Sequence, residues 1–517
     1  MKKYLLGIDY GTGGAKACII DDEANVIAYS YREYPIYTPN PGWSEHDPNL
    51  YWPIACDMIQ ECLAEAGVNP KDIKGIANSS ALPSMVMVDK NNNPINFAYN
   101  LMDRRASEEV RWIEENIGGK KIFEISCNRL EDHPFFVNLM WEKANRPDDY
   151  NSIYKALTID GYIRLKLTGE ATANYSSGSF FGVAYDIRTD EIDQNILNKI
   201  GISKEILPDF FPCDHIVGYV TDQAAKETGL VPGIPVAAGS VDCNAGWISG
   251  GAIEVGDMQV NLGTSGVMGV IHRDPNLMVD SLLNSSYTTG PDDYVTITAT
   301  TTGGQALRYI RDNLSQLEVA TENLVPGFNS YQALDAEAEQ INIGADGLIF
   351  LPYLMGERTP LWDPKARGVL FGLSLNHTKG HIVRATLEGV AFALYESFEI
   401  LKQQCSKINY PIVMNEGGAK SKIWRRIITD VFNVPTVLLK SRTGAPLGDA
   451  ILAGVATGVF PSFQIAKDTA EYIDRMEPDQ KAHDRYMQYY ELYKQVYINV
   501  KDNFADLELI RDQQISL

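Results

Sequence analysis

The sequence predicts a mixed α/β protein in which two similar halves face each other across a cleft. Residues 4–79 read as strands first, then a helix, then another strand, which favours a mixed sheet over a purely parallel one. A strand, a glycine turn and a second strand occur near the start and again about half the chain later. At 517 residues the chain has room for two or three domains. Two unrelated hairpins would give the same repetition of strand, glycine turn and strand, because glycine turns are common.

The first half opens with apolar runs joined by short polar or glycine turns. Gly11-Thr12-Gly13-Gly14 separates the first two runs, which predicts consecutive antiparallel strands. Apolar residues at helical spacing follow, and then a return to strand character. The expected elements are strands at 4–9, 15–20, 26–29 and 73–79 and a helix at 50–66.

The second half repeats this opening. Gly263-Thr264-Ser265-Gly266 lies between apolar runs and begins 252 residues after Gly11. We expect the boundary between the halves in the glycine-rich stretch 239–256, which gives an N-terminal domain 1–245 and a C-terminal domain 246–517. An aromatic stripe at 486–496 has helical spacing and predicts a closing helix packed on the core.

Charge and composition exclude several classes of protein. The chain has 45 Lys and Arg against 67 Asp and Glu, a formal net charge of −22. So acidic a surface repels phosphate backbones and anionic lipids, which argues against nucleic-acid and membrane partners. It does not forbid an anionic ligand, because backbone N–H groups can bind phosphate inside a negative protein.

The redox and targeting signals indicate a cytoplasmic protein. The seven cysteines are scattered and never in Cys-x-x-Cys spacing, which is typical of free thiols in a reducing cytosol. No secretory signal and no membrane-length apolar run is evident. His377 and His381 are four residues apart, but Gly380 between them favours the start of a surface helix over a metal site. The oligomeric state stays open, a homodimer included.

The two glycine turns could hold phosphate. Glycines allow positive φ and close approach to a ligand, so consecutive N–H groups can converge on phosphate oxygens. In the first turn Thr12 adds a hydroxyl, Lys16 adds a positive charge, and Asp9 could hold magnesium through water. The second turn offers the same chemistry, and the two together could clamp one triphosphate. A purely structural hairpin is the alternative for each.

Asp242 is the candidate catalytic base. It stands among small residues, in Gly239-Ser240-Val241-Asp242-Cys243, at an expected strand end where a substrate could approach it. A carboxylate there can accept the proton of a hydroxyl that attacks a γ-phosphoryl group. The alternative is an N-cap for a helix beginning near Asn244, and both roles could coexist.

Two further segments offer polar or backbone contacts. Asp103 and Arg104 provide an acceptor and a donor of the kind that bind sugar hydroxyls, with ordinary ion pairing as the alternative. Gly417-Gly418-Ala419 follows a strand-like run and precedes an expected helix containing Trp424. A glycine pair there suits a flat ring such as adenine, and equally a plain helix-start turn.

Taken together, these segments resemble the FGGY family of carbohydrate kinases, and most closely its xylulokinase-like branch. The resemblance runs from about Leu5 to Phe460. Besides the turns and Asp242, it includes Gly42-Trp43-Ser44-Glu45-His46-Asp47-Pro48, Asp103-Arg104-Arg105, Gly356-Glu357-Arg358-Thr359-Pro360, Gly368-Val369-Leu370-Phe371-Gly372-Leu373 and Ala385-Thr386-Leu387-Glu388.

The resemblance implies two ribonuclease-H-like domains of the actin-like ATPase fold flanking a central cleft, with sugar deep in the cleft and ATP mainly on the second domain. It also implies an ATP- and magnesium-dependent sugar kinase. Asp242 would be the catalytic base, Asp103 and Arg104 would lie with it on the sugar side, and Asp9 would serve the metal. The residues implied for ATP and its phosphates are Thr12, Gly13, Lys16, Gly263, Thr264, Gly304, Gly418 and Lys422.

The sequence departs from the family pattern at two places, and the second of them bears on the substrate. Asn138 stands where the family usually has lysine, and residues 78–84 lack the Gln-Met-His-Gly stretch usual in xylulokinases. Because the polar groups of a site decide which hydroxyl pattern it accepts, D-xylulose is the first expectation, with L-xylulose, ribulose, erythritol and glycerol as alternatives. Outside sugar kinases, a non-catalytic sugar or nucleotide sensor and an actin-like ATPase remain alternatives.

Overall fold

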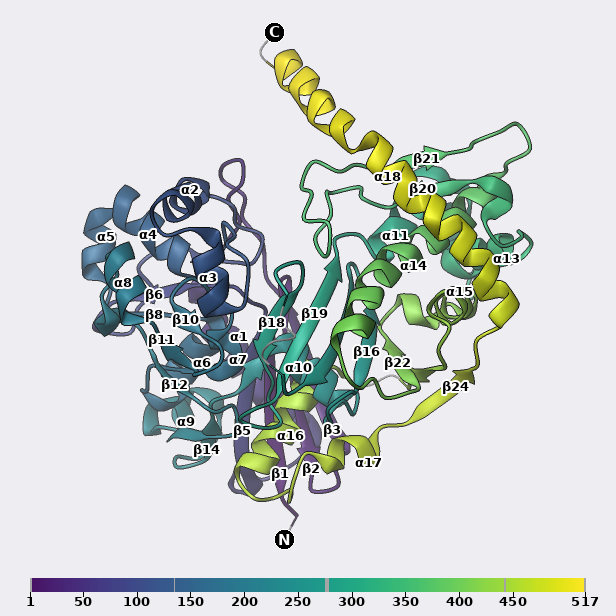
Figure 1. Cartoon of the computed structure of the whole chain (residues 1–517). Helices are drawn as coiled ribbons and strands as arrows, with labels where there is room; N and C mark the ends of the chain where they lie inside the picture. Colours follow the sequence, from purple (N-terminus) through teal and green to yellow (C-terminus); the bar gives the residue numbers. More distant parts are fainter. Residues whose placement is uncertain (1, 134, 275–278, 441–442, 516–517) are drawn as a thin grey trace. The chain divides into compact units, whose positions relative to one another are not determined.

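The computed structural model describes residues 2–133, 135–274, 279–440 and 443–515, drawn in Figure 1. The described chain forms two compact units. The first comprises Met1–Glu254, Ile271–Val295 and Arg442–Ala470, and the second comprises Val255–Val270, Thr296–Ser441 and Glu471–Leu517. The first crossing between units falls inside the expected boundary 239–256. The units differ from the expected domains 1–245 and 246–517, because the chain returns to the first unit twice.

The first unit is built on a seven-stranded mixed sheet in the order β13-β14-β5-β1-β2-β3, with β15 also paired to β5. Its strands are β1 (Tyr4–Tyr10), β2 (Gly14–Asp21), β3 (Val26–Glu33), β4 (Glu45–His46), β5 (Ile73–Ser80), β6 (Val86–Val88), β7 (Ala98–Tyr99), β8 (Lys155–Leu157), β9 (Thr172–Asn174), β10 (Tyr185–Asp186), β11 (Glu191–Ile192), β12 (Asp209–Phe211), β13 (Ile216–Tyr219), β14 (Pro235–Ala237), β15 (Ser240–Val241) and β18 (Leu283–Ser286). Its helices are α1 (Tyr51–Ala66), α2 (Ser107–Asn116), α3 (Gly119–Ser126), α4 (Phe135–Asn145), α5 (Pro147–Ser152), α6 (Ile159–Thr168), α7 (Tyr175–Gly178), α8 (Gln194–Ile200), α9 (Asp222–Thr228), α10 (Asp242–Ser249), α16 (Ala445–Ala456) and α17 (Gln464–Thr469).

The second unit contains the strand series β17-β16-β22-β23-β24. Its strands are β16 (Met258–Leu262), β17 (Gly266–His272), β19 (Tyr294–Thr300), β20 (Ile349–Leu351), β21 (Val369–Phe371), β22 (Ile412–Asn415), β23 (Thr436–Leu439) and β24 (Tyr472–Met476). Its helices are α11 (Gly304–Leu314), α12 (Gln316–Leu324), α13 (Ser330–Glu339), α14 (Lys379–Gln404), α15 (Lys422–Phe432) and α18 (Gln480–Ile515).

The two units share one strand pattern, which confirms the expected duplication. In the first, β1 pairs antiparallel with β2 and parallel with β5, and β14 continues the parallel series. In the second, β16 pairs antiparallel with β17 and parallel with β22, and β23 continues it. Each unit therefore opens with a hairpin whose tip is one of the glycine turns.

Close packing requires glycine at some positions of the two turns but not at all of them, since a Cβ on Gly13 would meet no atom within 4 Å. None of the glycines in Gly11–Gly14 or Gly263–Gly266 has a positive φ. A Cβ on Gly14 would lie 2.8 Å from the carbonyl oxygen of Arg32 on β3. A Cβ on Gly304 would lie 2.5 Å from the carbonyl oxygen of Gly263. Larger residues would push these backbones apart.

Helix α16 brings the late segment of the chain onto the first sheet. It packs on β1, β5 and α10, and Figure 1 shows it beside these elements. The contact is made backbone to backbone, because a Cβ on Gly7 would lie 1.9 Å from Pro446 O and one on Gly448 would lie 1.9 Å from Ala245 O. On the other face α1 packs against β2 and β3 over a buried apolar core.

The expected C-terminal helix is confirmed as α18, which packs on α14, α15 and β20. The aromatic stripe is its packing face, since Tyr486, Tyr490 and Tyr493 are at most 1% exposed. None of the described helices is both long and apolar enough to cross a membrane.

Candidate active site in two compact units

Three strands of the first sheet end at the same edge and carry the first group of site residues. β1, β5 and β15 run parallel, with Asp9 opposite Ser79 and Ser240 also opposite Ser79. Since the carboxyl ends of parallel strands share one edge of a sheet, Asp9 and Asp242, just after β15, lie at that edge. Loops at this edge are where open α/β sheets place their ligands.

Asp9 is a buried carboxylate held between a cation and a hydroxyl. Its side chain accepts from Lys16 Nζ at 3.2 Å and from Ser79 Oγ at 3.3 Å. Lys16 lies directly opposite Asp9 on β2, so the hairpin register creates the pair. Burial raises the pKa of Asp9 while Lys16 lowers it, and Asp9 in turn raises the pKa of Lys16.

Asp242 is the first residue of α10 and is only partly buried. The N-cap position is Val241, and the Asp242 side chain accepts from the N–H of Cys243 at 2.7 Å. No described residue forms an ion pair with Asp242. Burial, then the negative charge of Asp9, raise the pKa of Asp242 to about 7. A carboxylate with that pKa can take a proton near neutral pH.

Asp449 is a further acid at this edge, and the sequence patterns above do not identify it. It lies on α16, is fully buried, and accepts from Ser79 Oγ at 2.7 Å, the hydroxyl that also contacts Asp9. Its other oxygen, Oδ1, has no hydrogen-bond partner among the described residues. Burial, then Asp9, raise the pKa of Asp449 well above its ordinary value. The available signal was a lone acid in the otherwise apolar run 445–456.

We expect Asp449→Asn to flatten the pH dependence of stability. Buried Asp449 keeps its proton in the folded chain, whereas an unfolded aspartate loses it near about pH 4. The free energy of unfolding of the wild type therefore decreases as the pH rises from there through the raised pKa. Asparagine does not titrate. Urea denaturation at about pH 5 and pH 8 measures the difference, with Asp222→Asn at the exposed start of α9 as control; an equal pH difference in Asp449→Asn and wild type contradicts this assignment.

Asp103 and Arg104 lie in different environments. Asp103 is fully buried, and its carboxylate accepts from the guanidinium of Arg105 at 2.6–3.0 Å and from Ser44 N–H at 2.8 Å. Arg105 also stacks on Trp43, 3.7 Å from the ring centre. The exposed Arg104 pairs with Asp132 at 3.1 Å. Asp103 thus orders its own loop, and its contact with substrate hydroxyls stays a prediction.

Segment 78–84, which departs from the xylulokinase pattern, is held by hydrogen bonds inside the first unit. Ser80 Oγ donates to Asp160 Oδ1 at 2.7 Å, and Asn78 Nδ2 donates to Asp160 O at 2.8 Å. Asp160 also pairs with Arg164 at 2.7 Å, and both are fully buried. The polar groups at the start of this segment therefore bond to the protein itself.

The second unit contains a cavity of about 510 Å³ beside the second glycine turn. Among the predicted residues, Gly263, Thr264, Gly304 and Gly418 line it. Lys422, the exposed first residue of α15, does not line the cavity. The two residues before it, Lys420 and Ser421, do.

Hydrogen bonds fix the glycine turn against the start of α11. Gly304 N–H donates to Gly263 O at 2.7 Å, and the N–H groups of Gly303 and Gln305 donate to Thr264 O at 3.0 Å each. These donors are used within the protein. Contact with phosphate at this end therefore falls to the turn itself and the Thr264 side chain.

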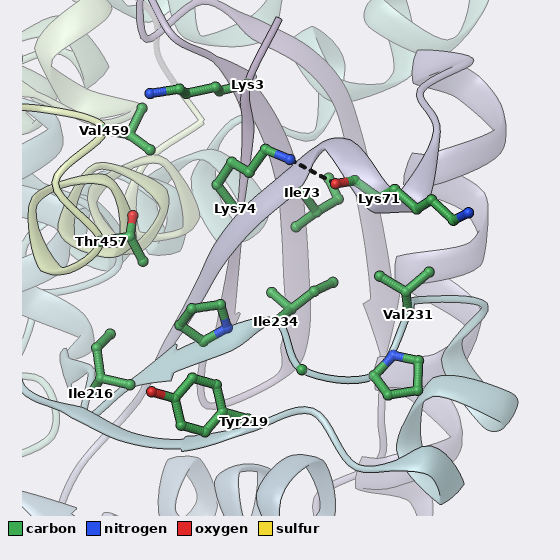
Figure 2. Close-up of a pocket in the computed structure, with 13 residues that line it drawn as sticks. Lys3, Lys71, Ile73, Lys74, Ile216, Tyr219, Val231, Ile234, Thr457 and Val459 are labelled. Atoms are coloured by element: carbon green, nitrogen blue, oxygen red, sulfur yellow. Dashed lines mark hydrogen bonds between the residues drawn. The ribbon is translucent and has the colours of Figure 1, made fainter. Parts of the chain in front are cut away.

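A second cavity, of about 480 Å³, lies at the opposite end of the first sheet, where β5 begins. Figure 2 shows its apolar lining, including Ile73, Ile216 and Ile234, with three lysines around it. The Lys74 amine donates to Lys71 O at 2.7 Å, and the Lys71 amine points away from the apolar residues. Tyr219 and Thr457 also line it, but none of the predicted site residues does, so we assign this cavity no ligand.

The first unit offers few ligands for a metal. No cluster of three His, Cys, Asp or Glu with metal-binding geometry occurs within the described ranges. Magnesium fits such a site, because it keeps several waters and uses one or two carboxylates together with phosphate oxygens. Asp9, whose carboxylate accepts from Lys16 and Ser79, is compatible with that ligand set. His381 forms a capping box with Thr378 at the start of α14, as the helix-start interpretation expects.

Comparison with known proteins places these features in a family. The model for the N-terminal domain of the FGGY family of carbohydrate kinases matches residues 4–249, and that for the C-terminal domain matches 258–457. A xylulose kinase of Staphylococcus epidermidis is 30% identical over 98% of this chain and 99% of its own length. A gluconokinase of Bacillus subtilis is 29% identical over 90% of each. The crystal structure of a xylulose kinase from Rhodospirillum rubrum aligns with a TM-score of 0.88 at 26% identity, covering 97% of this chain and all of that one.

Proposed function

The chain belongs to the FGGY family of carbohydrate kinases, and from that premise we propose that it phosphorylates a primary hydroxyl of a small ketose, converting D-xylulose to D-xylulose 5-phosphate. The observation that carries this proposal is Asp242: a partly buried acid without an ion-pair partner in the described chain, with a pKa near 7, at the same sheet edge as Asp9 and Lys16. Those properties suit a base that accepts a hydroxyl proton.

We assign the residues as follows. Asp242 accepts the proton of the attacking hydroxyl, Lys16 stabilises charge on the transferring phosphoryl group, and Thr12 and Gly13 contact its oxygens. ATP occupies the cavity of the second unit, with its phosphates toward Gly263 and Thr264. Magnesium, held through Asp9, would neutralise charge on the phosphates.

The choice of sugar rests on the relatives. Xylulose kinases are similar to this chain over almost its whole length, and a gluconokinase is nearly as similar. Gluconate carries a carboxylate, which a site would match with a free cation. Arg105 is committed to Asp103 and Glu45, and Arg104 to Asp132, which favours an uncharged sugar.

A coupled ADP-release assay tests the proposal. With ATP and magnesium we expect turnover stimulated by D-xylulose above L-xylulose, ribulose, erythritol, glycerol and gluconate. Stimulation by another compound of this panel alone replaces the sugar but keeps the reaction class. Hydrolysis independent of every sugar supports an ATPase, and no turnover with any compound supports the sensor alternative; both overturn the proposal.

The pH profile should follow the pKa of Asp242. Because that pKa is raised to about 7, the residue carries a proton below this pH and cannot accept one from the sugar. We expect kcat/KM for the sugar at saturating ATP and magnesium to fall about tenfold per pH unit below about pH 7 and to level off above it. A flat profile between about pH 6 and 8 contradicts the base role.

We also propose that the kinase works in the cytoplasm. All seven cysteines are free in the structure, and five are buried, as expected for a protein kept in a reducing compartment. A homodimer remains a prediction, and size-exclusion chromatography with light scattering tests it.

A further inference from the structure

The cavity of the second unit has one wall formed by α13. Asn329, Tyr331, Gln332 and Asp335 line this wall, while Gly417, Gly418, Lys420 and Ser421 line another. Gly263, Thr264 and Gly304 also line the cavity. The cavity therefore combines the second glycine turn, which could contact phosphates, with a polar wall that includes a carboxylate.

Asp335 has one carboxylate oxygen bonded within the protein and one that is not. The Ser421 hydroxyl donates to the Asp335 side chain, which lowers the pKa of that acid, although burial outweighs it. Ser421 Oγ also accepts from Trp424 N–H at 3.2 Å, so its position is fixed by the start of α15. Asp335 Oδ1 is buried and has no hydrogen-bond partner in the described chain.

An unpartnered buried acceptor costs free energy, and in a ligand cavity it is commonly satisfied by the ligand. We propose that Asp335 Oδ1 accepts a hydrogen bond from a neutral donor on the nucleoside of the bound nucleotide, which makes Asp335 a specificity-determining residue of this kinase. This inference rests on the proposed binding of ATP in the cavity. The donor is a ribose hydroxyl or the amino group of adenine, which share this chemistry.

The charge of Asp335 also fixes the direction in which a nucleotide lies. Burial raises the pKa of Asp335 to about 6, so above neutral pH the group is a carboxylate that repels phosphates. The phosphates must then lie toward Gly263 and Thr264, and the nucleoside toward α13. The same residue therefore selects the nucleoside and excludes the reversed orientation.

Equilibrium binding to the full-length protein at about pH 7.5 tests the inference. Calorimetry with ATP, 2′-deoxy-ATP, 3′-deoxy-ATP and purine riboside triphosphate removes one candidate donor at a time. We expect the wild type to bind one analogue about tenfold to a hundredfold more weakly than ATP, as for a lost hydrogen bond to a charged group. Asp335→Asn should weaken ATP by a similar factor and bind that analogue almost as well as ATP.

The matched control is Glu339→Gln, the same chemical change one helical turn along α13 at an exposed position. The Glu339→Gln variant should bind ATP and the three analogues with the affinities of the wild type, and so with the same ratios between ATP and each analogue. Thermal melting checks that Asp335→Asn is folded, and Asp335→Ala provides a second variant if it is not. Unchanged ATP affinity in the Asp335 variants, or equal weakening of ATP and all three analogues, overturns the inference while leaving the kinase intact. Failure of the wild type to bind ATP instead overturns the proposed function.

Discussion

Asp242→Asn should lower kcat for sugar phosphorylation by about 10²–10⁴-fold, because the amide cannot accept the hydroxyl proton. The substitution keeps the size of the side chain and can retain the contact with Cys243 N–H at the start of α10. Gly263, Thr264, Gly304 and Gly418 line a cavity to which Asp242 does not contribute, so the dissociation constant for ATP should change little. Steady-state kinetics and calorimetric ATP titration measure the two effects.

The control for this variant is Asp222→Asn. Asp222 is also the first residue of a helix in the first unit, α9, but it is exposed and outside the site. It should leave kcat unchanged. Full turnover by Asp242→Asn would remove Asp242 from the base role, whereas equal losses in both variants would indicate a general effect of losing an acid at a helix start.

Gly448→Ala should be strongly destabilising, because the new methyl group would lie 1.9 Å from the carbonyl oxygen of Ala245. Neither atom is at the end of a flexible side chain, so α16 and α10 must move apart. Overpacking of this kind costs about 1–3 kcal/mol and occasionally more. Activity should fall as well, since α10 begins at Asp242 and α16 carries Asp449. Urea denaturation gives the free energy of unfolding, and kinetics give the activity.

Gly246→Ala is the matched control for that variant. Gly246 lies on α10, the partner helix, but a Cβ there meets no atom within 4 Å. Alanine in a helix interior is favoured over glycine by roughly 0.5–1 kcal/mol, so this variant should be unchanged or slightly more stable. Similar losses in both variants would contradict the account of the α10–α16 contact.

Local patterns predicted the strands and helices at the start of each unit. The runs at 4–9, 15–20 and 73–79 correspond to β1, β2 and β5, because alternation and turn residues are properties of neighbouring residues. The repeated glycine turn correctly indicated duplication. The constraint on Gly14 and Gly304 is the backbone of Arg32 and of Gly263, which no local pattern reveals.

The sequence by itself determined the family and the sugar-kinase chemistry, and it made Asp242 the candidate base, since these depend on ordered motifs along the chain. Only the tertiary structure decided which groups share an environment. In the tertiary structure α16 packs on the first sheet, so the Ser79 hydroxyl contacts both Asp449 and Asp9. The Asp103 carboxylate accepts a hydrogen bond from Arg105. Among the described residues, the tertiary structure also left one oxygen of Asp335 without a hydrogen-bond partner in a cavity. Burial and partner choice depend on residues hundreds of positions apart, and they set both the pKa of an acid and whether it is free for a ligand.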